Sequence, residues 1–369
     1  MSPQTTPPTP YLRIDGPRVR RNLQRLADYC QKHNLRLSPH TKTHKSIRVG
    51  RAQVEHGAAG LTVAKVGEAE VMHQAADGAD MLLAYPLVNA ERAARLAEIA
   101  QQRTVRVGLD STRPADVLGD AARAADATFG ILIDLDTGMH RTGVQSAQAA
   151  LELAQYVDRV NGLRVDGIFT YYGHIWGTAE DMPGKLKPVN DRLTQAVDLF
   201  NKSGFDTGIV TGGSTPTALH SHHIPALTEI RPGTYIYYDR NCFANGVCDQ
   251  EDCAARIVAT VVSDAVPDQV VLDAGSKTLT SDRYVSDPNG GHGHIVEYPE
   301  AIITKLSEEH GQVNISKCSR KPEVGERVTI IPNHVCVAVN MQNAAWWSES
   351  EDGSGELEPL PIDARGKLW

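Results

Sequence analysis

At 369 residues, the chain is long enough to form one large barrel domain and a smaller second domain. A formal charge of -8 without a basic stripe argues against a nucleic-acid or membrane-surface partner, and no stretch reaches the roughly 20 apolar residues that span a bilayer. The six cysteines lack the spacing of a disulfide framework, which predicts a cytoplasmic protein with thiols that are free or bound to metal.

Short apolar runs alternate with helical segments through the first two thirds of the chain. A strand at 11–15 and an amphipathic helix with Pro17 in its first turn come first. The eight runs that follow are Leu35–Pro39, Gly60–Val63, Met81–Tyr85, Val105–Leu109, Phe129–Leu135, Val165–Tyr171, Thr207–Thr211 and Leu227–Ile230. This repetition favours a (β/α)₈ barrel. A doubly wound open sheet is the alternative, weakened because no G-x-G-x-x-G follows the first strand.

The pattern changes near Tyr235. Runs such as 256–262, 269–272 and 327–331 are β-branched and bounded by turn residues, and the acidic tail after Trp347 is expected to be a surface loop. We therefore expect three parts: an N-terminal strand at 1–16 that joins the second domain, a barrel at 17–234, and a mostly β domain at 235–369.

A lysine follows the first barrel strand, at the end where such barrels hold their active sites. Period-two alternation directs Ser38, His40 and Lys42 inward, where partial desolvation lowers the pKa of a lysine and frees its amine to form a Schiff base. Lys45 is the alternative, but it has the opposite parity and is expected on the following helix. A lone lysine after a strand is usually exposed, and His40 strengthens the active-site interpretation only modestly.

Polar and aromatic residues end the fifth and sixth strands. The segment from Asp134 to Gly143 leads through a glycine turn to Arg141, which can hold an anionic oxygen or, equally, brace the loop. The sixth strand leads to Tyr172 and His174. A histidine there can act as an acid or base near neutral pH, or only hydrogen-bond in the core.

The seventh strand runs into a glycine-rich turn. Backbone N–H groups at Gly213 and the hydroxyls of Ser214 and Thr215 favour a phosphate site over a simple tight turn, with a helix expected just afterwards. The eighth strand brings Tyr235 to the other side of the same turn.

A histidine and a cysteine share one predicted strand in the β domain. In the run 330–339, His334 and Cys336 lie two apart and hence on one face. Imidazole and thiolate together favour Zn²⁺, with Mn²⁺ or Mg²⁺ as other possibilities. A half-buried cysteine without a metal is the common alternative.

The segment Pro39–Lys45 resembles the lysine motif of the D-serine dehydratase and D-threonine aldolase family, fold-type III pyridoxal 5′-phosphate (PLP) enzymes related to alanine racemase. The resemblance extends over nearly the whole chain. It includes Thr9-Pro10, Ile14-Asp15, Asp136–Gly143, Gly173-His174, Gly212–Pro216, Arg231–Tyr235 and Asp273–Lys277.

The resemblance implies roles for the matching positions. The expected cofactor-binding residues are Lys42, His40, Arg141, Tyr172, Gly213, Ser214, Thr215 and Tyr235, the catalytic residues are Lys42 and His174, and the metal ligands are His334 and Cys336. It also implies a head-to-tail homodimer, in which the β domain of one subunit covers the barrel mouth of the other.

The implied substrate is a D-configured 3-hydroxy amino acid whose hydroxyl contacts the metal. If Lys42 removes the α-proton, water is lost and a 2-oxo acid and ammonia result; if His174 removes the hydroxyl proton, glycine and an aldehyde result. Cys336 favours the dehydratase, of the D-serine or D-3-hydroxyaspartate type, because aldolases of the family tend to carry Asp at the second metal position. An amino-acid racemase would need no metal, and a non-catalytic PLP carrier would resemble the barrel alone.

Overall fold

The computed structural model describes residues 6–75, 78–287, 289–351 and 353–369. The chain folds into two compact units. We call Gln24–Gly233 with Gly366–Trp369 the barrel unit, and Met1–Leu23 with Thr234–Arg365 the β unit. Among the described residues, no helix is both long and apolar enough to cross a membrane.

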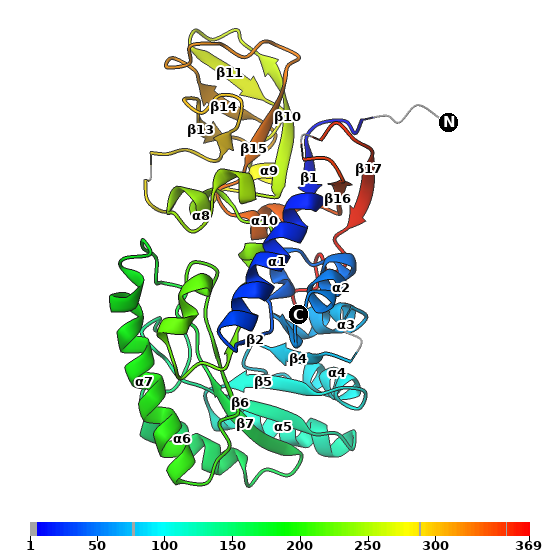
Figure 1. Ribbon diagram of the computed structural model, residues 1–369. Coiled ribbons are helices and arrows are strands. Elements are labelled where there is room, and N and C mark those ends of the chain that lie inside the picture. The colour runs from blue at the N-terminus through cyan, green and yellow to red at the C-terminus, as the bar shows by residue number, and fades with distance from the viewer. Residues whose placement is uncertain (1–5, 76–77, 288, 352) are drawn as a thin grey trace. The chain divides into compact units, whose positions relative to one another are not determined.

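The barrel unit contains a sheet of parallel strands, and its order along the described chain is β2-β9-β8-β7-β6-β5-β4-β3 (Figure 1). These strands are β2 (Arg36–Leu37), β3 (Gly60–Val63), β4 (Asp80–Leu83), β5 (Val105–Leu109), β6 (Phe129–Asp134), β7 (Leu163–Phe169), β8 (Ile209–Gly212) and β9 (Glu229–Ile230). A parallel bridge from His40 to Thr62 links the two ends of the sheet, which is therefore nearly closed. The predicted barrel is confirmed.

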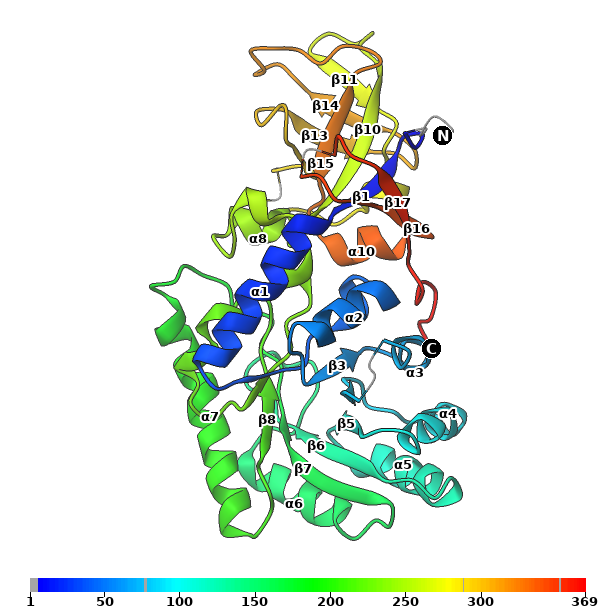
Figure 2. The same cartoon turned by 45° about the vertical axis from the view of Figure 1, so that its right-hand side comes forward.

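Helices alternate with these strands and lie along the outer face of the sheet (Figures 1 and 2). They are α1 (Gly16–Lys32), α2 (Ile47–Glu55), α3 (Val66–Met72), α4 (Ala90–Ala100), α5 (Thr112–Ala124), α6 (Ala147–Val157) and α7 (Met182–Lys202). Local sequence explains where they begin: the side chains of Asn89 and Ser146 accept hydrogen bonds from the first turns of α4 and α6. Apolar residues on one face, such as Leu96 of α4, are buried.

Ion pairs fill the barrel at the N-terminal ends of its strands. Arg106 of β5 contacts Asp80 at 2.6 Å and Asp166 of β7 at 2.7 Å. Arg36 of β2 contacts Asp80 at 3.1 Å and Glu229 of β9 at 3.5 Å. Each charge therefore has at least one opposite partner, and the strands are tied together from inside the sheet.

The chain between β2 and α2 differs from the prediction. The first barrel strand ends at Leu37, because Pro39 cannot extend the ladder, and Lys42 lies in a 3₁₀ turn, η1 (Thr41–Thr43). Lys45 was predicted to lie on the following helix, but it precedes α2 and has a φ of 51°. After the glycine-rich turn, a 3₁₀ segment, η2 (Ala218–His223), stands in place of the expected α-helix.

The β unit is built on a mostly antiparallel sheet, whose main path across the described residues is β13-β14-β11-β10-β1-β16-β17. Its strands are β1 (Tyr11–Asp15), β10 (Ala255–Ser263), β11 (Gln269–Leu272), β12 (His294–Ile295), β13 (Ile302–Leu306), β14 (Gly311–Asn314), β15 (Arg327–Ile331), β16 (Ala344–Ser348) and β17 (Leu357–Pro361). Short helical segments are η3 (Thr234–Ile236), α8 (Arg240–Ala244), η4 (Gln250–Asp252), α9 (Ser276–Leu279) and α10 (Val335–Asn340). The N-terminal strand β1 pairs with β10 and β16.

Two predictions for the β unit are wrong. Strand β15 ends at Ile331, and His334 is the N-cap of α10 rather than a strand residue. The turn is fixed because the buried amide of Asn333 donates to the carbonyls of Asp282 and Gly291. The tail after Trp347 is not only a loop, since β17 pairs with β16 through backbone hydrogen bonds.

Candidate active site

A cavity of about 330 Å³ lies at the C-terminal ends of the barrel strands. Its lining residues are His40, Lys42, Ala64, Lys65, Ala84, Tyr85, Pro86, Gly108, Asp134, Arg141, Thr142, Phe169, Tyr171 and Arg231. The structure thus brings together three of the predicted site residues, namely His40, Lys42 and Arg141. This is the end of a barrel where active sites are found.

Hydrogen bonds hold the loop that carries Lys42. The buried Glu68 accepts from the Thr41 hydroxyl at 2.8 Å and from the backbone N–H of Ala64 at 2.8 Å. The backbone N–H of Lys45 donates to the carbonyl of Thr41 at 2.8 Å. Lys42 is left half-buried on the cavity wall, whereas Lys45 is buried and outside the lining. The geometry therefore favours Lys42 over its alternative as the reactive amine.

Burial sets the protonation of two cavity residues. The pKa of His40 falls well below its ordinary value because the ring is buried and faces Lys42 and Arg231. His40 is therefore neutral at pH 7. Burial also lowers the pKa of Arg231 to about 10, which leaves this guanidinium charged.

Arg231 is held rigidly but was absent from the predicted cofactor-binding residues. Its Nε donates to the Thr211 hydroxyl at 2.9 Å, and its guanidinium lies 3.9 Å from the centroid of the Phe169 ring. The motif Arg231–Tyr235 could have indicated a role for Arg231. Periodicity alone does not show that Arg231, which follows a strand of two residues, faces the lumen of the barrel.

Asp134 is the single carboxyl among the lining residues that the structure describes. Burial raises its pKa to about 6, although the Thr142 hydroxyl donates to it at 2.7 Å and opposes the shift. The same lining contains four basic side chains, those of Lys42, Lys65, Arg141 and Arg231. A cavity with this excess of positive charge fits anionic ligands.

The site residues predicted after β6 and after β7 differ in where they lie. Arg141 reaches the cavity and lies over Tyr171, 4.6 Å from the ring centroid. His174 is exposed and outside the cavity lining, and its ring abuts Gly138. The catalytic role of His174 therefore stays a prediction.

The glycine-rich turn fits a phosphate group. Gly213 has a φ of +92°, and the backbone N–H of Ser214 donates to the Thr217 hydroxyl at 3.1 Å, which closes a turn that contains Thr215. Tyr172 is fully buried, yet its hydroxyl has no partner among the described residues. A Cβ placed on Gly213 would lie 3.6 Å from that hydroxyl. Burial raises the pKa of Tyr172, so the hydroxyl keeps its proton and can donate it to a phosphate oxygen.

Tyr235 lies in η3 of the β unit, where it is buried. Its predicted place beside the glycine-rich turn stays a prediction.

In the β unit, His334 and Cys336 come together at the start of α10. Their side chains hydrogen-bond, and in the metal-free protein the neighbouring Cys336 raises the pKa of His334, against the effect of burial and with help from Asp239. Asp239 accepts from the His334 ring Nδ1 at 3.1 Å. Asp239 was missed because it lies 95 residues away along the chain.

The donor set of the β unit fits a soft divalent metal such as Zn²⁺. Throughout the described part of the chain, no cluster of three or more His, Cys, Asp or Glu side chains is arranged to hold a metal ion. His334 and Cys336 would therefore supply two protein ligands, and the remaining positions would be open to water or to a substrate hydroxyl.

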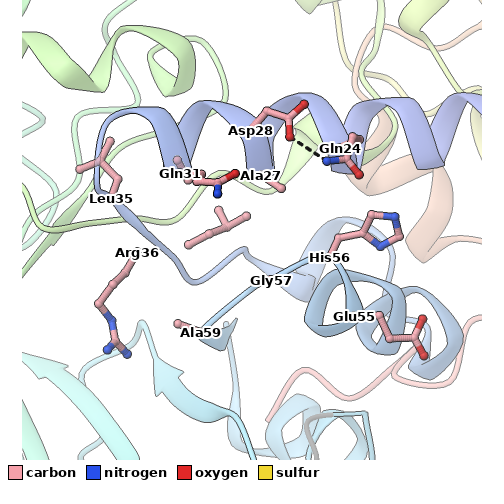
Figure 3. A pocket seen from close by; sticks show the side chains of 12 residues that line it. Gln24, Ala27, Asp28, Gln31, Leu35, Arg36, Glu55, His56, Gly57 and Ala59 are labelled. Atoms are coloured by element: carbon pink, nitrogen blue, oxygen red, sulfur yellow. Dashed lines mark hydrogen bonds between the residues drawn. The ribbon is translucent and has the colours of Figure 1, made fainter.

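A larger cavity, of about 650 Å³, lies beside α1 at the N-terminal ends of β2 and β3 (Figure 3). Three of its polar side chains have partners within the barrel unit. Gln24 donates to Asp28 at 2.7 Å, Arg36 pairs with Asp80, and the His56 ring bonds the carbonyl of Ala52 at 2.7 Å. Size alone therefore does not mark the reactive site.

A nearly closed parallel barrel with a lysine at its cation-rich mouth, joined to a second sheet unit, defines an alanine racemase-like PLP enzyme. The family model of the alanine racemase N-terminal domain matches residues 14–241, and that of the putative serine dehydratase domain matches residues 254–346. The chain belongs to the family of PLP-dependent lyases that contains D-serine dehydratase and D-threonine aldolase.

Individual relatives cover almost the whole chain. D-threo-3-hydroxyaspartate dehydratase of Delftia sp. (strain HT23) is 30% identical over 94% of this chain and 95% of its own. The crystal structure of D-threonine aldolase from Filomicrobium marinum has a TM-score of 0.89 and 29% identity, and the match covers 98% of this chain and 97% of that one. A cysteine-to-alanine mutant of D-threo-3-hydroxyaspartate dehydratase, in the metal-free form, has a TM-score of 0.85 and 27% identity over 97% of this chain and 98% of that one.

Proposed function

We propose that this protein is a PLP- and Zn²⁺-dependent dehydratase of D-3-hydroxy amino acids, which yields a 2-oxo acid and ammonia. The observation that carries the proposal is the imidazole–thiolate pair of His334 and Cys336, since a dehydratase needs a Lewis acid for a poor leaving group. The dehydratase relative, and its metal-free form in which a cysteine is replaced, support this assignment.

The cavity residues have distinct tasks in this reaction. When bound, PLP supplies an electron sink for charge that develops at the substrate Cα, and the metal polarises the β-hydroxyl. Lys42 holds the cofactor and takes the α-proton on its Nζ. Tyr172 and the turn at Gly213 would hold the phosphate, and the buried, charged Arg231 would supply a cation to the cofactor.

The charge of the cavity favours an acidic substrate. Lys65 lies on the cavity wall with its Nζ 3.5 Å from the centroid of the Tyr85 ring. This cation is additional to those assigned to the cofactor, and it would bind the second carboxylate of D-3-hydroxyaspartate. Replacement of Lys65 by Met should lower kcat/KM for that substrate about 10- to 100-fold relative to D-serine, the worth of one charge-assisted contact.

A second candidate activity is the D-threonine aldolase reaction. It is supported by the aldolase structure, which matches this chain as well as the dehydratase structures do, with TM-scores of 0.89 against 0.87 and 0.86. In this case a base near the metal, for which His174 is the candidate, takes the hydroxyl proton, and the Cα–Cβ bond breaks to give glycine and an aldehyde.

Product analysis separates the two reactions. The purified holoenzyme is incubated with D-serine, D-threonine and D-3-hydroxyaspartate, and ammonia, 2-oxo acid, glycine and aldehyde are measured. We expect ammonia and 2-oxo acid, lost on treatment with a chelator and restored by Zn²⁺. Glycine with an aldehyde would establish the aldolase instead, and full activity after metal removal would disprove the role of the metal.

We also propose a cytoplasmic homodimer. None of the six cysteines, all of which lie in described residues, forms a disulfide, as suits a reducing compartment. The dimer rests on the likeness to alanine racemases, and light scattering of the purified protein tests it.

A further inference from the structure

One short segment of the β unit contacts both members of the metal pair. It runs from Thr234 to Asp239 and begins with the 3₁₀ turn η3. The backbone N–H groups of Tyr237 and Tyr238 donate to the carbonyl of Thr234 at 3.1 and 2.6 Å. The turn therefore brings the two ends of the segment towards each other.

Asp239, at the end of this segment, is almost completely buried and uses both carboxylate oxygens. Its Oδ1 accepts from the backbone N–H of Cys242 at 3.0 Å and caps α8. Its Oδ2 accepts from the ring Nδ1 of His334 at 3.1 Å and from the backbone N–H of Val335 at 3.2 Å. One side chain thus fixes both the ring of His334 and the start of the helix that carries Cys336.

Thr234, at the beginning of the segment, contacts the other member of the pair. Its hydroxyl lies 3.8 Å from the sulfur of Cys336, within hydrogen-bond distance for a sulfur atom. A hydroxyl that donates to a thiolate disperses part of its charge and restricts its rotamer.

We propose that Asp239 and Thr234 are positioning residues for the metal: Asp239 holds Nδ1 of His334 protonated so that Nε2 is the metal-binding nitrogen, and Thr234 orients the thiolate of Cys336. The inference rests on the proposed metal-dependent function. It adds that two residues outside the pair set the affinity of the metal.

The reason is tautomeric. A neutral imidazole has one N–H and one lone pair, and the nitrogen that donates to a carboxylate is the one that keeps the proton. Asparagine at position 239 would offer only one acceptor oxygen in place of two. If that oxygen caps α8, the amide NH2 faces the His334 ring and favours the other tautomer; if it accepts from the ring, the cap is lost.

The test is the affinity for Zn²⁺, measured on the full chain by competition with a chromophoric chelator. We expect Asp239→Asn to weaken Zn²⁺ binding about 10- to 100-fold, the usual effect of removing an outer-sphere partner. Thr234→Val should weaken it less, and Thr234→Ser, which keeps the hydroxyl, should restore it. Asp249→Asn is the matched control, because Asp249 is an exposed N-cap of η4 in the same unit.

The Tm of each metal-free variant separates positioning from folding. If Asp239→Asn lowers that Tm beyond the control, Thr234→Val and Thr234→Ser decide, since they leave the cap of α8 intact. Wild-type affinity in both Asp239→Asn and Thr234→Val would overturn the inference. Failure of the proposed function looks different: wild type would not bind Zn²⁺, or His334→Ala would bind it as tightly as wild type.

Discussion

The two ends of the barrel strands differ in how their charged side chains are balanced. At the N-terminal ends, Arg36 and Arg106 each contact two carboxylates, and in the larger cavity there Gln24, Arg36 and His56 are bonded to neighbouring protein groups. At the C-terminal ends, several cations face a smaller cavity with Asp134 as their carboxyl. Unbalanced charge, and not cavity size, therefore distinguishes the binding site from the structural network. The following predictions test this contrast.

Lys42→Ala should have the largest effect. Loss of the amine that holds the cofactor and takes the α-proton should lower kcat by on the order of 10³-fold or more. Borohydride reduction followed by peptide mass spectrometry should label Lys42 in wild type only. Lys185→Ala, at an exposed ion pair on α7, is the control and should keep full activity. Label at Lys45 would refute the assignment.

Asp166→Asn should destabilise the other end of the barrel. Asp166 is buried and pairs with Arg106 at 2.7 Å. Its carboxylate lies so close to Gly130 that any side chain at position 130 would collide with it. Arg106 keeps its contact with Asp80 but loses the buried carboxylate, so the free energy of unfolding, measured in urea at pH 7, should fall by about 2 kcal/mol. Asp120→Asn, in an exposed pair on α5, should cost at most about 1 kcal/mol. A loss below about 1 kcal/mol for Asp166→Asn would break the comparison.

Asp134→Asn should raise the free energy of unfolding, whereas Asp166→Asn lowers it. Because burial raises the pKa of Asp134 to about 6, the folded protein holds this proton more tightly than the unfolded chain does. Wild type therefore loses stability as pH rises from about 4 to 6, and the loss is complete above pH 6. Asparagine cannot ionise, so the variant should be more stable by about 2 kcal/mol at pH 7.5, with no gain below pH 4. Urea unfolding of the apoprotein across this range measures the difference, and a pH-independent gap would contradict the buried charge.

Tyr172→Phe should cause the smallest of these changes, a moderate loss of affinity for PLP. Removal of a buried hydroxyl that lacks a partner among the described residues should leave the free energy of unfolding of the apoprotein unchanged or higher, but weaken PLP binding about 10-fold. Titration of the apoprotein with PLP measures this. Tyr156→Phe, whose hydroxyl bonds Asp116 on the outer helices, should leave PLP affinity unaltered. If both variants bind PLP alike, the turn at Gly213 is not the phosphate site.

Much of the fold could be predicted because local pattern and tertiary context agree there. The strands at Gly60–Val63, Val105–Leu109 and Gln269–Leu272 have the predicted bounds. Each is an apolar or β-branched run between turn residues, and backbone pairing in a buried sheet needs little more.

The site could be predicted only in part. The run that contains His334 and Cys336 is rich in valine, which favours a strand, but contacts of Asn333 and Asp239 turn it into a helix. Distant hydrogen bonds outweighed β propensity, and local pattern carries no information about them. His40 and Lys42 do line one cavity, although the alternation used to place them ends at Leu37.

The carboxylate of Glu68 joins two loops that serve different purposes. One of its oxygens binds Thr41, next to Lys42, and the other binds Ala64, next to Lys65. The lysine proposed to hold the cofactor and the lysine proposed to select the substrate thus depend on a single carboxylate. A laboratory evolution campaign that alters this anchor to admit a new substrate would shift the reactive amine with it, so selectivity is more safely redesigned at Tyr85, whose ring lies against Lys65.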